Sequence, residues 1–230
     1  MRKLLISLVL LLSVNFIYSA SYSDLADKFA NLPNNMIILT HVEANVNMNG
    51  KIRRDVSFEE LNFISFDDEL SYMSIIYNPS NYAGISTIAK ENEPLIIFDP
   101  IKLSYKEEEN MPSELFLDIF VPQSGYEVVL EKDNLIEINY KNMRIKYEIG
   151  DDGLPYSMII FSKDDIVLSK VEISKYETSP HGIFYPLVVT TWTIHYPFHQ
   201  LLHRNYDVKA YDALDPSIFT VDYLKKVCKP

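Results

Sequence analysis

The chain has 230 residues and a formal net charge of −11, from 32 acidic and 21 basic side chains. Nucleic acids are unfavourable partners, because phosphate binding needs clustered Lys and Arg, and an anionic membrane surface would repel an acidic protein. The length suits one domain, and no Pro-, Ser- or Gly-rich linker and no repeat of fixed period divides it.

The first residues have the features of a secretory signal peptide. Arg2 and Lys3 precede a largely apolar stretch that ends at Ile17, and small residues follow up to Ser21. A transmembrane anchor is the alternative, but polar residues interrupt the stretch, which is shorter than the roughly 20 residues needed to span a bilayer. We therefore expect cleavage within Ser19 to Ser21.

An exported domain without disulfides should follow. We assign residues 1–21 to the signal peptide and residues 22–230 to a single domain. No cysteine follows the apolar stretch to accept a lipid, and the one cysteine of the chain, Cys228, cannot form an internal disulfide. These features predict a periplasmic protein that is free in its compartment, and we take it to be a monomer.

Three signals shape the start of this domain. Across 21–32, apolar residues recur at helical spacing, which predicts a short amphipathic helix. Across 38–48, apolar and polar residues alternate, which predicts a strand with one dry face. Asn49-Gly50 favours a type I′ turn, so the chain should reverse there into a partner strand from Lys51.

The middle of the chain predicts short strands and a second helix. Ser57 and Glu60 could form a helical capping box, whereas the aromatic residues of 57–66 suit a strand, so both structures stay open there. Residues 111–120 predict a short helix that is apolar on more than one side, as suits a lid. Short strands separated by proline-containing turns are predicted at 72–77, 83–90, 95–98 and 101–105.

The second half has the clearest alternation. Strands with short, turn-rich connections are predicted at 126–130, 136–140, 143–149, 156–161, 166–176 and 183–195. Because the connections are short, neighbouring strands should pair as a meander. The predicted fold class is mainly β with a few short helices, and the antiparallel sheet should curl into a barrel or half-barrel.

Histidines at intervals of four form a pattern that resembles a metal site. From Pro197 onward a short helix could place His199 and His203 on one face, where two imidazoles can chelate zinc. The glutamate of zincins is absent, and Pro197 separates His195 from the other two, which favours a polar loop or helix face. We therefore expect no metal.

Patterns typical of catalysis are missing from the sequence. There is no serine nucleophile elbow and no phosphate-binding glycine loop, and the acidic runs at 67–69 and 107–109 are typical of solvated loops. Cys228 lies near the end of the chain, where a fraying terminus positions a nucleophile poorly. We expect no catalytic residue, no cofactor and no enzymatic activity.

Several features of this layout occur together in one known family. They are the helix after a signal peptide, the long strand that turns at Asn49-Gly50, the meander over 126–160, the strand start Gly182-Ile183-Phe184-Tyr185-Pro186-Leu187, and the closing segment Leu214-Asp215-Pro216-Ser217-Ile218-Phe219. Together they resemble the periplasmic outer-membrane lipoprotein carrier (LolA-like) superfamily, of which this chain would be a divergent member.

The resemblance implies a strongly curved antiparallel sheet, an unclosed β-barrel whose apolar concave face receives acyl chains. It implies a periplasmic carrier or chaperone that shields the acyl chains of a lipoprotein or lipid for transfer toward the outer membrane, with protein partners in the inner and outer membranes. Apolar residues of the two predicted helices would form the lid: Leu25, Phe29, Leu32, Leu115, Phe116 and Ile119.

Strand alternation also gives candidate residues for a lipid cavity. The inward-facing positions are Val42, Val46, Ile138, Ile145, Tyr147, Ile160, Val171, Val188 and Trp192. These side chains could equally fill an ordinary closed core, because periodicity indicates burial and not cavities.

The strand after the first hairpin departs from the family pattern. Typical carriers have a basic residue followed by proline there, with an arginine that helps to hold the lid. Residues 51–56 read Lys-Ile-Arg-Arg-Asp-Val without proline, and either Arg53 or Arg54 could take that role. The alternative function is therefore an envelope sensor or regulatory binding module on the same fold, without carrier activity.

Overall fold

The structure, a computed structural model, describes residues 20–48, 51–67, 69–108, 112–193 and 198–228. The predicted signal peptide lies almost entirely outside these residues and stays a prediction. In chain order the elements are α2 (Tyr22–Phe29), β1 (Asn35–Met48), β2 (Lys51–Ser65), β3 (Ser71–Asn78), β4 (Ser86–Lys90), β5 (Leu95–Asp99), β6 (Ser104–Glu108), the 3-10 helix η1 (Ser113–Phe116), β7 (Tyr126–Lys132), β8 (Leu135–Tyr140), β9 (Met143–Ile149), β10 (Pro155–Ser162), β11 (Val167–Thr178), β12 (Phe184–Thr193), β13 (Phe198–Tyr211), the 3-10 helix η2 (Pro216–Ile218) and α3 (Val221–Val227).

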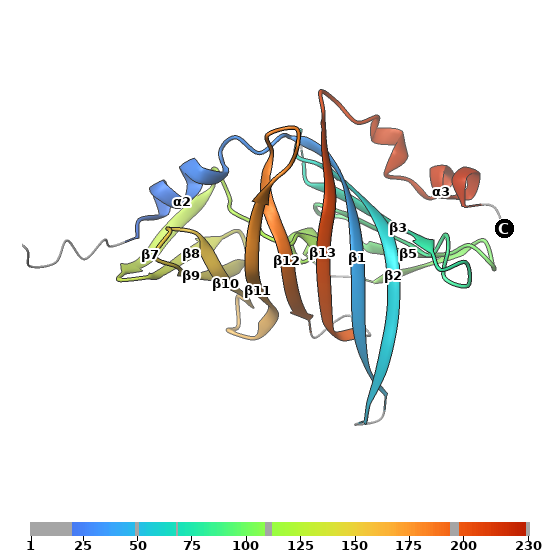
Figure 1. Cartoon of the computed structure of the whole chain (residues 1–230), viewed down its shortest axis with the longest axis horizontal. Helices are drawn as coiled ribbons and strands as arrows, with labels where there is room; N and C mark the ends of the chain where they lie inside the picture. Colours follow the sequence, from blue (N-terminus) through green and yellow to red (C-terminus); the bar gives the residue numbers. More distant parts are fainter. Residues whose placement is uncertain (1–19, 49–50, 68, 109–111, 194–197, 229–230) are drawn as a thin grey trace, which may run out of the picture.

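The described strands form one 13-stranded antiparallel sheet in the order β6-β5-β4-β3-β2-β1-β13-β12-β11-β10-β9-β8-β7. Sequence neighbours pair throughout, except that β1 pairs with β13 and that β6 and β7 lie at the two edges of this order. In Figure 1 the long strands β12, β13, β1 and β2 stand in the middle, and shorter strands turn away from them at both ends. The predicted unclosed, curved antiparallel sheet is therefore confirmed.

The first hairpin pairs as its turn residues predict. Met48 faces Lys51, so the two strands are separated by Asn49 and Gly50, which lie outside the described residues. β2 pairs with β1 along almost its whole length, and the pairing decides the open question over 57–66 in favour of a strand. A helix there would leave the hydrogen-bonding groups of β1 without their partner strand.

The two faces of the sheet carry separate cores, because successive side chains of a strand point to opposite faces. Tyr72 and Ala89 belong to the main core, on what we call the inner face. Met73 and Ile88 belong to a smaller core on the outer face. Tyr72 pairs with Ala89, and Met73 pairs with Ile88, so the register of β3 and β4 places each pair on its own face of the sheet.

α2 covers the inner face at the end formed by β7, β8 and β9 (Figure 1). Ser21 caps the helix by accepting a hydrogen bond from the Asp24 amide at 3.2 Å. Tyr22, Leu25 and Phe29 are almost completely buried, as the helical spacing predicts. The ring centroid of Tyr22 lies 6.1 Å from that of Tyr147 on β9, so the helix packs directly on the sheet.

The C-terminal segment covers the outer face at the opposite end of the sheet (Figure 1). Thr220 caps α3, and Phe219 and Leu224 pack against Met73 of β3. Cys228 is buried in the same cluster, so the expectation of a fraying C-terminus was wrong. The sequence did not predict that the C-terminal segment is packed, because the seven-residue helix α3 has too few turns for a clear periodic signal.

The helix predicted over 111–120 is shorter than expected, and the helix considered from Pro197 onward is a strand. Of the described residues 112–120, only Ser113–Phe116 is helical, as one 3-10 turn, and Leu117 returns to extended backbone. Residues 198–211 form β13 and not a helix from Pro197, because the strand fills the position between β1 and β12. Among the described residues, no helix combines the length and the apolar character that crossing a membrane would need.

Candidate functional site

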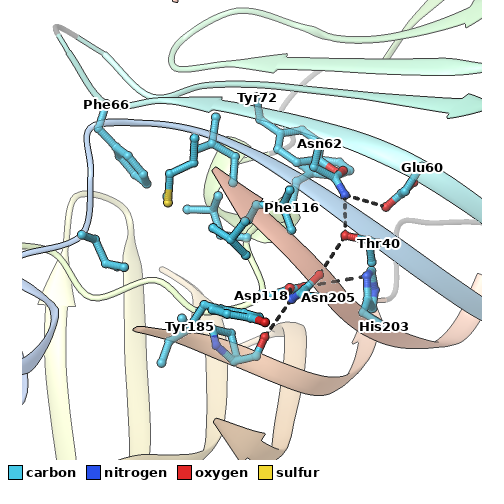
Figure 2. A pocket seen from close by; sticks show the side chains of 18 residues that line it. Thr40, Glu60, Asn62, Phe66, Tyr72, Phe116, Asp118, Tyr185, His203 and Asn205 are labelled. Carbon is cyan, nitrogen blue, oxygen red and sulfur yellow. Dashed lines mark hydrogen bonds and ion pairs between the residues drawn. The ribbon is translucent and has the colours of Figure 1, made fainter. Parts of the chain in front are cut away.

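An apolar pocket lies on the inner face, between the long central strands and the segment that follows β6. We call residues 112–124 the covering segment and the space beneath it the inner pocket, shown in Figure 2. The cavity has a volume of about 70 Å³. Its described apolar lining comprises Leu32, Met36, Ile38, Ile64, Phe66, Phe116, Leu117, Ile119 and Val208.

One end of the inner pocket is polar, and hydrogen bonds join its side chains across the sheet. Asn62 on β2 donates hydrogen bonds to Thr40 Oγ1 at 2.9 Å and to Glu60 Oε1 at 3.2 Å. The Tyr72 hydroxyl donates to Asn62 Oδ1 at 2.6 Å. Thr40 continues the network by donating to Asn205 Oδ1 on β13 at 2.8 Å. The network therefore spans four neighbouring strands, β3, β2, β1 and β13, and each side chain in it orients the next.

Asp118 fastens the covering segment to this network (Figure 2). Asn205 donates one hydrogen bond to the Asp118 carboxylate and another to the Pro186 carbonyl oxygen at 2.9 Å. His203 Nδ1 lies 3.7 Å from the second Asp118 oxygen. A charged side chain of the covering segment is thus held by polar side chains that project from the sheet.

Burial shifts the ionisation of two groups in the polar end. It raises the pKa of the Glu60 carboxyl to about 7, against an opposing hydrogen bond from Asn62 and with a smaller contribution from the Asp118 charge. Burial lowers the pKa of His203, which the Asp118 charge partly offsets. Near neutral pH the polar end therefore contains a Glu60 carboxyl group near its midpoint and a neutral His203 imidazole.

Two buried tyrosines hold the other half of the covering segment. Tyr147 on β9 donates its hydroxyl to the Phe120 carbonyl oxygen, and Tyr22 on α2 donates to the Pro122 carbonyl oxygen, both at 2.7 Å. Burial raises the pKa of both phenols. The covering segment is therefore anchored to the sheet and to α2 through side chains, and not by strand pairing.

Tyr147→Phe should destabilise the fold by about 1 to 3 kcal/mol, because it leaves the buried Phe120 carbonyl without its donor while keeping the ring. Urea unfolding of the two proteins measures this difference. Tyr156→Phe is the matched control, because Tyr156 is 51% exposed. Equal losses in both variants would contradict the anchoring role of Tyr147.

A charged contact holds the start of the covering segment. Lys141, in the β8–β9 turn, lies 2.5 Å from Glu91 and 3.4 Å from the buried Glu114 of η1. Burial acts to lower the pKa of the Lys141 ammonium, but its carboxylate partners outweigh burial and raise it. This contact joins two distant parts of the sheet through the covering segment.

A second cavity, which we call the groove, adjoins the inner pocket. Its volume is about 360 Å³, and it lies between α2, the covering segment and β8. Leu32, Phe66 and Ile119 line both spaces. The rest of the groove lining mixes apolar side chains with polar ones, among them the acidic Glu69 and Glu91. The three shared side chains therefore lie between the inner pocket and a larger, partly apolar space.

The predicted lid residues are divided between these two spaces and the packed core. Leu32 and Ile119 line both spaces, Phe116 lines the inner pocket, and Phe29 lines the groove. Leu25 and Leu115 line neither and pack into the main core. The covering segment thus occupies the place expected of a lid, although most of it is extended.

Among the predicted lipid-cavity residues whose side chains the structure describes, none lines the inner pocket or the groove. A group on β8 to β11 packs in the inner-face core: Ile138, Ile145, Tyr147, Ile160 and Val171. Val42 is buried in a small cluster with Ala44 and Phe58. The side chain of Val46 lies outside what the structure describes. The structure therefore places the group on β8 to β11 on the expected face but in its packed part.

Val188 and Trp192 lie on the outer face, which corrects the expectation that they point inward. Val189 and Thr191 face Ile173 and Val171 of the inner core, so the residues that alternate with them face outward. The Lys170 ammonium lies 5.2 Å from the centroid of the Trp192 ring. The sequence interpretation was shifted by one residue on this strand.

The histidine pattern does not form a metal site among the described residues, where no cluster of three or more His, Cys, Asp or Glu side chains is found. His199 and His203 lie on β13, and His195 lies outside the described residues. His203 instead lines the inner pocket. The spacing of four was therefore not a helical face.

The polar end of the inner pocket was missed in the sequence. Its signal is a polar residue in an apolar register: Thr40 stands between Ile38 and Val42 on the dry face of β1. Glu60 and Asn62 alternate in the same way once 57–66 is known to be a strand. The sequence left that stretch undecided, so this part of the pattern was not available.

Comparisons with known proteins identify the fold. No family model and no curated protein matches the sequence. Among solved structures, a domain from Vibrio parahaemolyticus that is described as an outer membrane lipoprotein-sorting protein is similar with a TM-score of 0.63 and 8% identity, over 92% of this chain and 100% of that one. A DUF1329 family protein from Desulfovibrio piger gives 0.62 and 12%, over 88% and 97% of the two chains.

A LolA superfamily protein from Nitrosomonas europaea is similar with a TM-score of 0.59 and 13% identity, over 89% of this chain and 98% of that one. The likeness extends over nearly the whole of all three structures. It confirms, at the level of the fold, the resemblance to the LolA-like superfamily that the sequence layout suggested.

Proposed function

We propose that this protein is a carrier that shields an acyl chain of a lipid or lipoprotein on the inner face of the sheet, beneath the covering segment. The observation that carries the proposal is the apolar inner pocket, which meets a larger, partly apolar groove at Leu32, Phe66 and Ile119. The fold shared with a lipoprotein-sorting domain supports it. Export to the periplasm, with cleavage of residues 1–21 and one domain over 22–230, belongs to the same proposal.

Burial of the chain supplies the binding energy without any reactive group. A chain of 14 to 16 carbons gains on the order of 10 kcal/mol, at about 0.8 kcal/mol per methylene, before the cost of opening the site. The groove, at about 360 Å³, lies within the usual range of ligand pockets, whereas the inner pocket, at about 70 Å³, lies below it. A long chain therefore enters only when the covering segment moves.

Lipid extraction and probe uptake test this proposal together. Protein purified from an envelope fraction is extracted for mass spectrometry, and the delipidated protein is titrated with a neutral fluorescent long-chain alcohol. We expect bound acyl lipid in the extract and saturable uptake at one site. A clean extract with no saturable uptake would overturn the proposal, and capture of one envelope protein by the same sample would then favour the sensor alternative.

A further inference from the structure

The polar end of the inner pocket has hydrogen-bond acceptors that lack donors. Glu60 is 7% exposed, and one of its carboxyl oxygens accepts from Asn62, while no described residue donates to the other. His203 Nε2 is buried and has no hydrogen-bond partner among the described residues. Only Nε2 is a buried atom without a partner, which is costly, whereas the second Glu60 oxygen lacks a donor without being fully buried. Both atoms can therefore accept a hydrogen bond from a group in the pocket.

The neighbours of His203 indicate which kind of group is missing. Burial lowers the pKa of His203, so the ring is neutral near pH 7. Asp118, 3.7 Å from Nδ1, favours the tautomer with the proton on Nδ1. Nε2 then has a free lone pair. His203 Nε2 and the second Glu60 oxygen can therefore both accept a hydrogen bond from a donor.

The charges of the lining residues limit which head group can bind in the inner pocket. The described residues that line the inner pocket include Glu60 and Asp118 but no Lys or Arg. A carboxylate or phosphate head group would meet two carboxyl groups and no compensating cation. An ammonium group carries three N–H donors and a positive charge, which match both the free acceptors and the sign of the site. A hydroxyl group supplies a single donor and no charge.

We propose that the inner pocket binds the primary ammonium group of a single-chain amphiphile, with Glu60, Asp118 and His203 as acceptors and the chain running past Ile119 into the groove. The proposal rests on the proposed function, because it names the class of amphiphile that the same site takes. The cavity of about 70 Å³ has room for about two water-sized groups, which suits an ammonium and its first methylene. The apolar chain occupies the space that the displaced covering segment opens.

A chain-matched series tests the head group. Dodecylamine, dodecanol and dodecanoate compete at pH 8 with the neutral fluorescent alcohol for the delipidated protein. Because a charge-assisted hydrogen bond replaces a neutral one, we expect dodecylamine to bind about tenfold or more tightly than dodecanol, and dodecanoate to bind most weakly.

Glu60→Gln is the diagnostic variant, because it keeps the shape of the side chain and removes the charge. The ratio of dodecylamine to dodecanol affinity should fall about tenfold, because only the ammonium group loses a charged partner. Glu59→Gln removes a charge from the neighbouring residue on the outer face and should leave the ratio unchanged.

The outcomes separate the two proposals. Dodecanoate binding as tight as dodecylamine, or a ratio that Glu60→Gln does not change, would overturn the ammonium proposal while leaving the carrier intact. Failure of all three ligands to compete, together with no uptake of the neutral alcohol, would overturn the proposed function itself.

Discussion

Ile119→Arg is expected to lower the affinity for a neutral long-chain alcohol at least about a hundredfold. Ile119 lines both the inner pocket and the groove, so the substitution places a guanidinium group in the passage between them. The larger, charged side chain blocks the passage to an apolar chain, and a loss of about 3 kcal/mol of binding free energy accounts for a hundredfold change. Uptake of the fluorescent alcohol measures the loss.

Two further variants distinguish blocked binding from a general effect of charge. Ile101→Arg adds the same group at a position that is 80% exposed, and it should bind the alcohol as the unaltered protein does. Ile119→Ala removes bulk without adding charge, and it should bind at least as tightly. Wild-type affinity in a folded Ile119→Arg protein would show that the chain does not pass between the two spaces.

The sheet could be predicted because its signals are local. Alternation over β7 to β11, with turns of a few residues, determines which strands pair and in what order. The pairing of the last strand, β13, with the first strand, β1, joins residues far apart in the sequence, so no local sequence pattern predicts it. The histidine spacing after Pro197 was compatible with a helix. Residues 198–211 form a strand instead, because they fill the position between β1 and β12 in the sheet.

The candidate site was harder to predict, because alternation identifies a face and not what covers it. Ile138 and Ile145 share the inner face with Ile38, yet the first two are packed in the core while Ile38 lines the cavity. The difference comes from the covering segment, whose path follows from anchors such as Tyr147, far away in the sequence. The family resemblance implied that Phe116 and Ile119 belong to a lid, and the structure places both in the wall of the inner pocket.

The covering segment makes the proposed entry of a long chain compatible with a small cavity. Its polar contacts to the body of the protein are side-chain bonds at Glu114, Asp118, Phe120 and Pro122, and not a continuous ladder. Separate bonds of this kind can break one group at a time. Under the proposed function, a chain that enters from the groove would reach Ile119 first and the polar end last, so the Asp118 contact would be the final barrier.

Because Glu60 is buried, the free energy of unfolding should fall as the pH rises from about 4.5 to about 7. The folded protein keeps the Glu60 proton up to about pH 7, whereas an ordinary carboxyl group in the unfolded chain, with a pKa of 4.5, loses it earlier. Over this window the unfolded state binds fewer protons, so stability falls with pH, and above about pH 7 the loss is complete. The pKa difference corresponds to about 3 kcal/mol.

Urea unfolding of the wild type and Glu60→Gln between pH 4 and pH 8 isolates this effect, because Gln does not titrate. The variant should match the wild type at pH 4 and exceed its stability by up to about 3 kcal/mol at pH 8. Asp118→Asn removes a charge that helps to raise the Glu60 pKa, so in that background the fall should end at a lower pH and be smaller. A stability difference that stays constant with pH would mean that Glu60 is solvated or already paired with a cation, and then the polar end would have no place for an ammonium group.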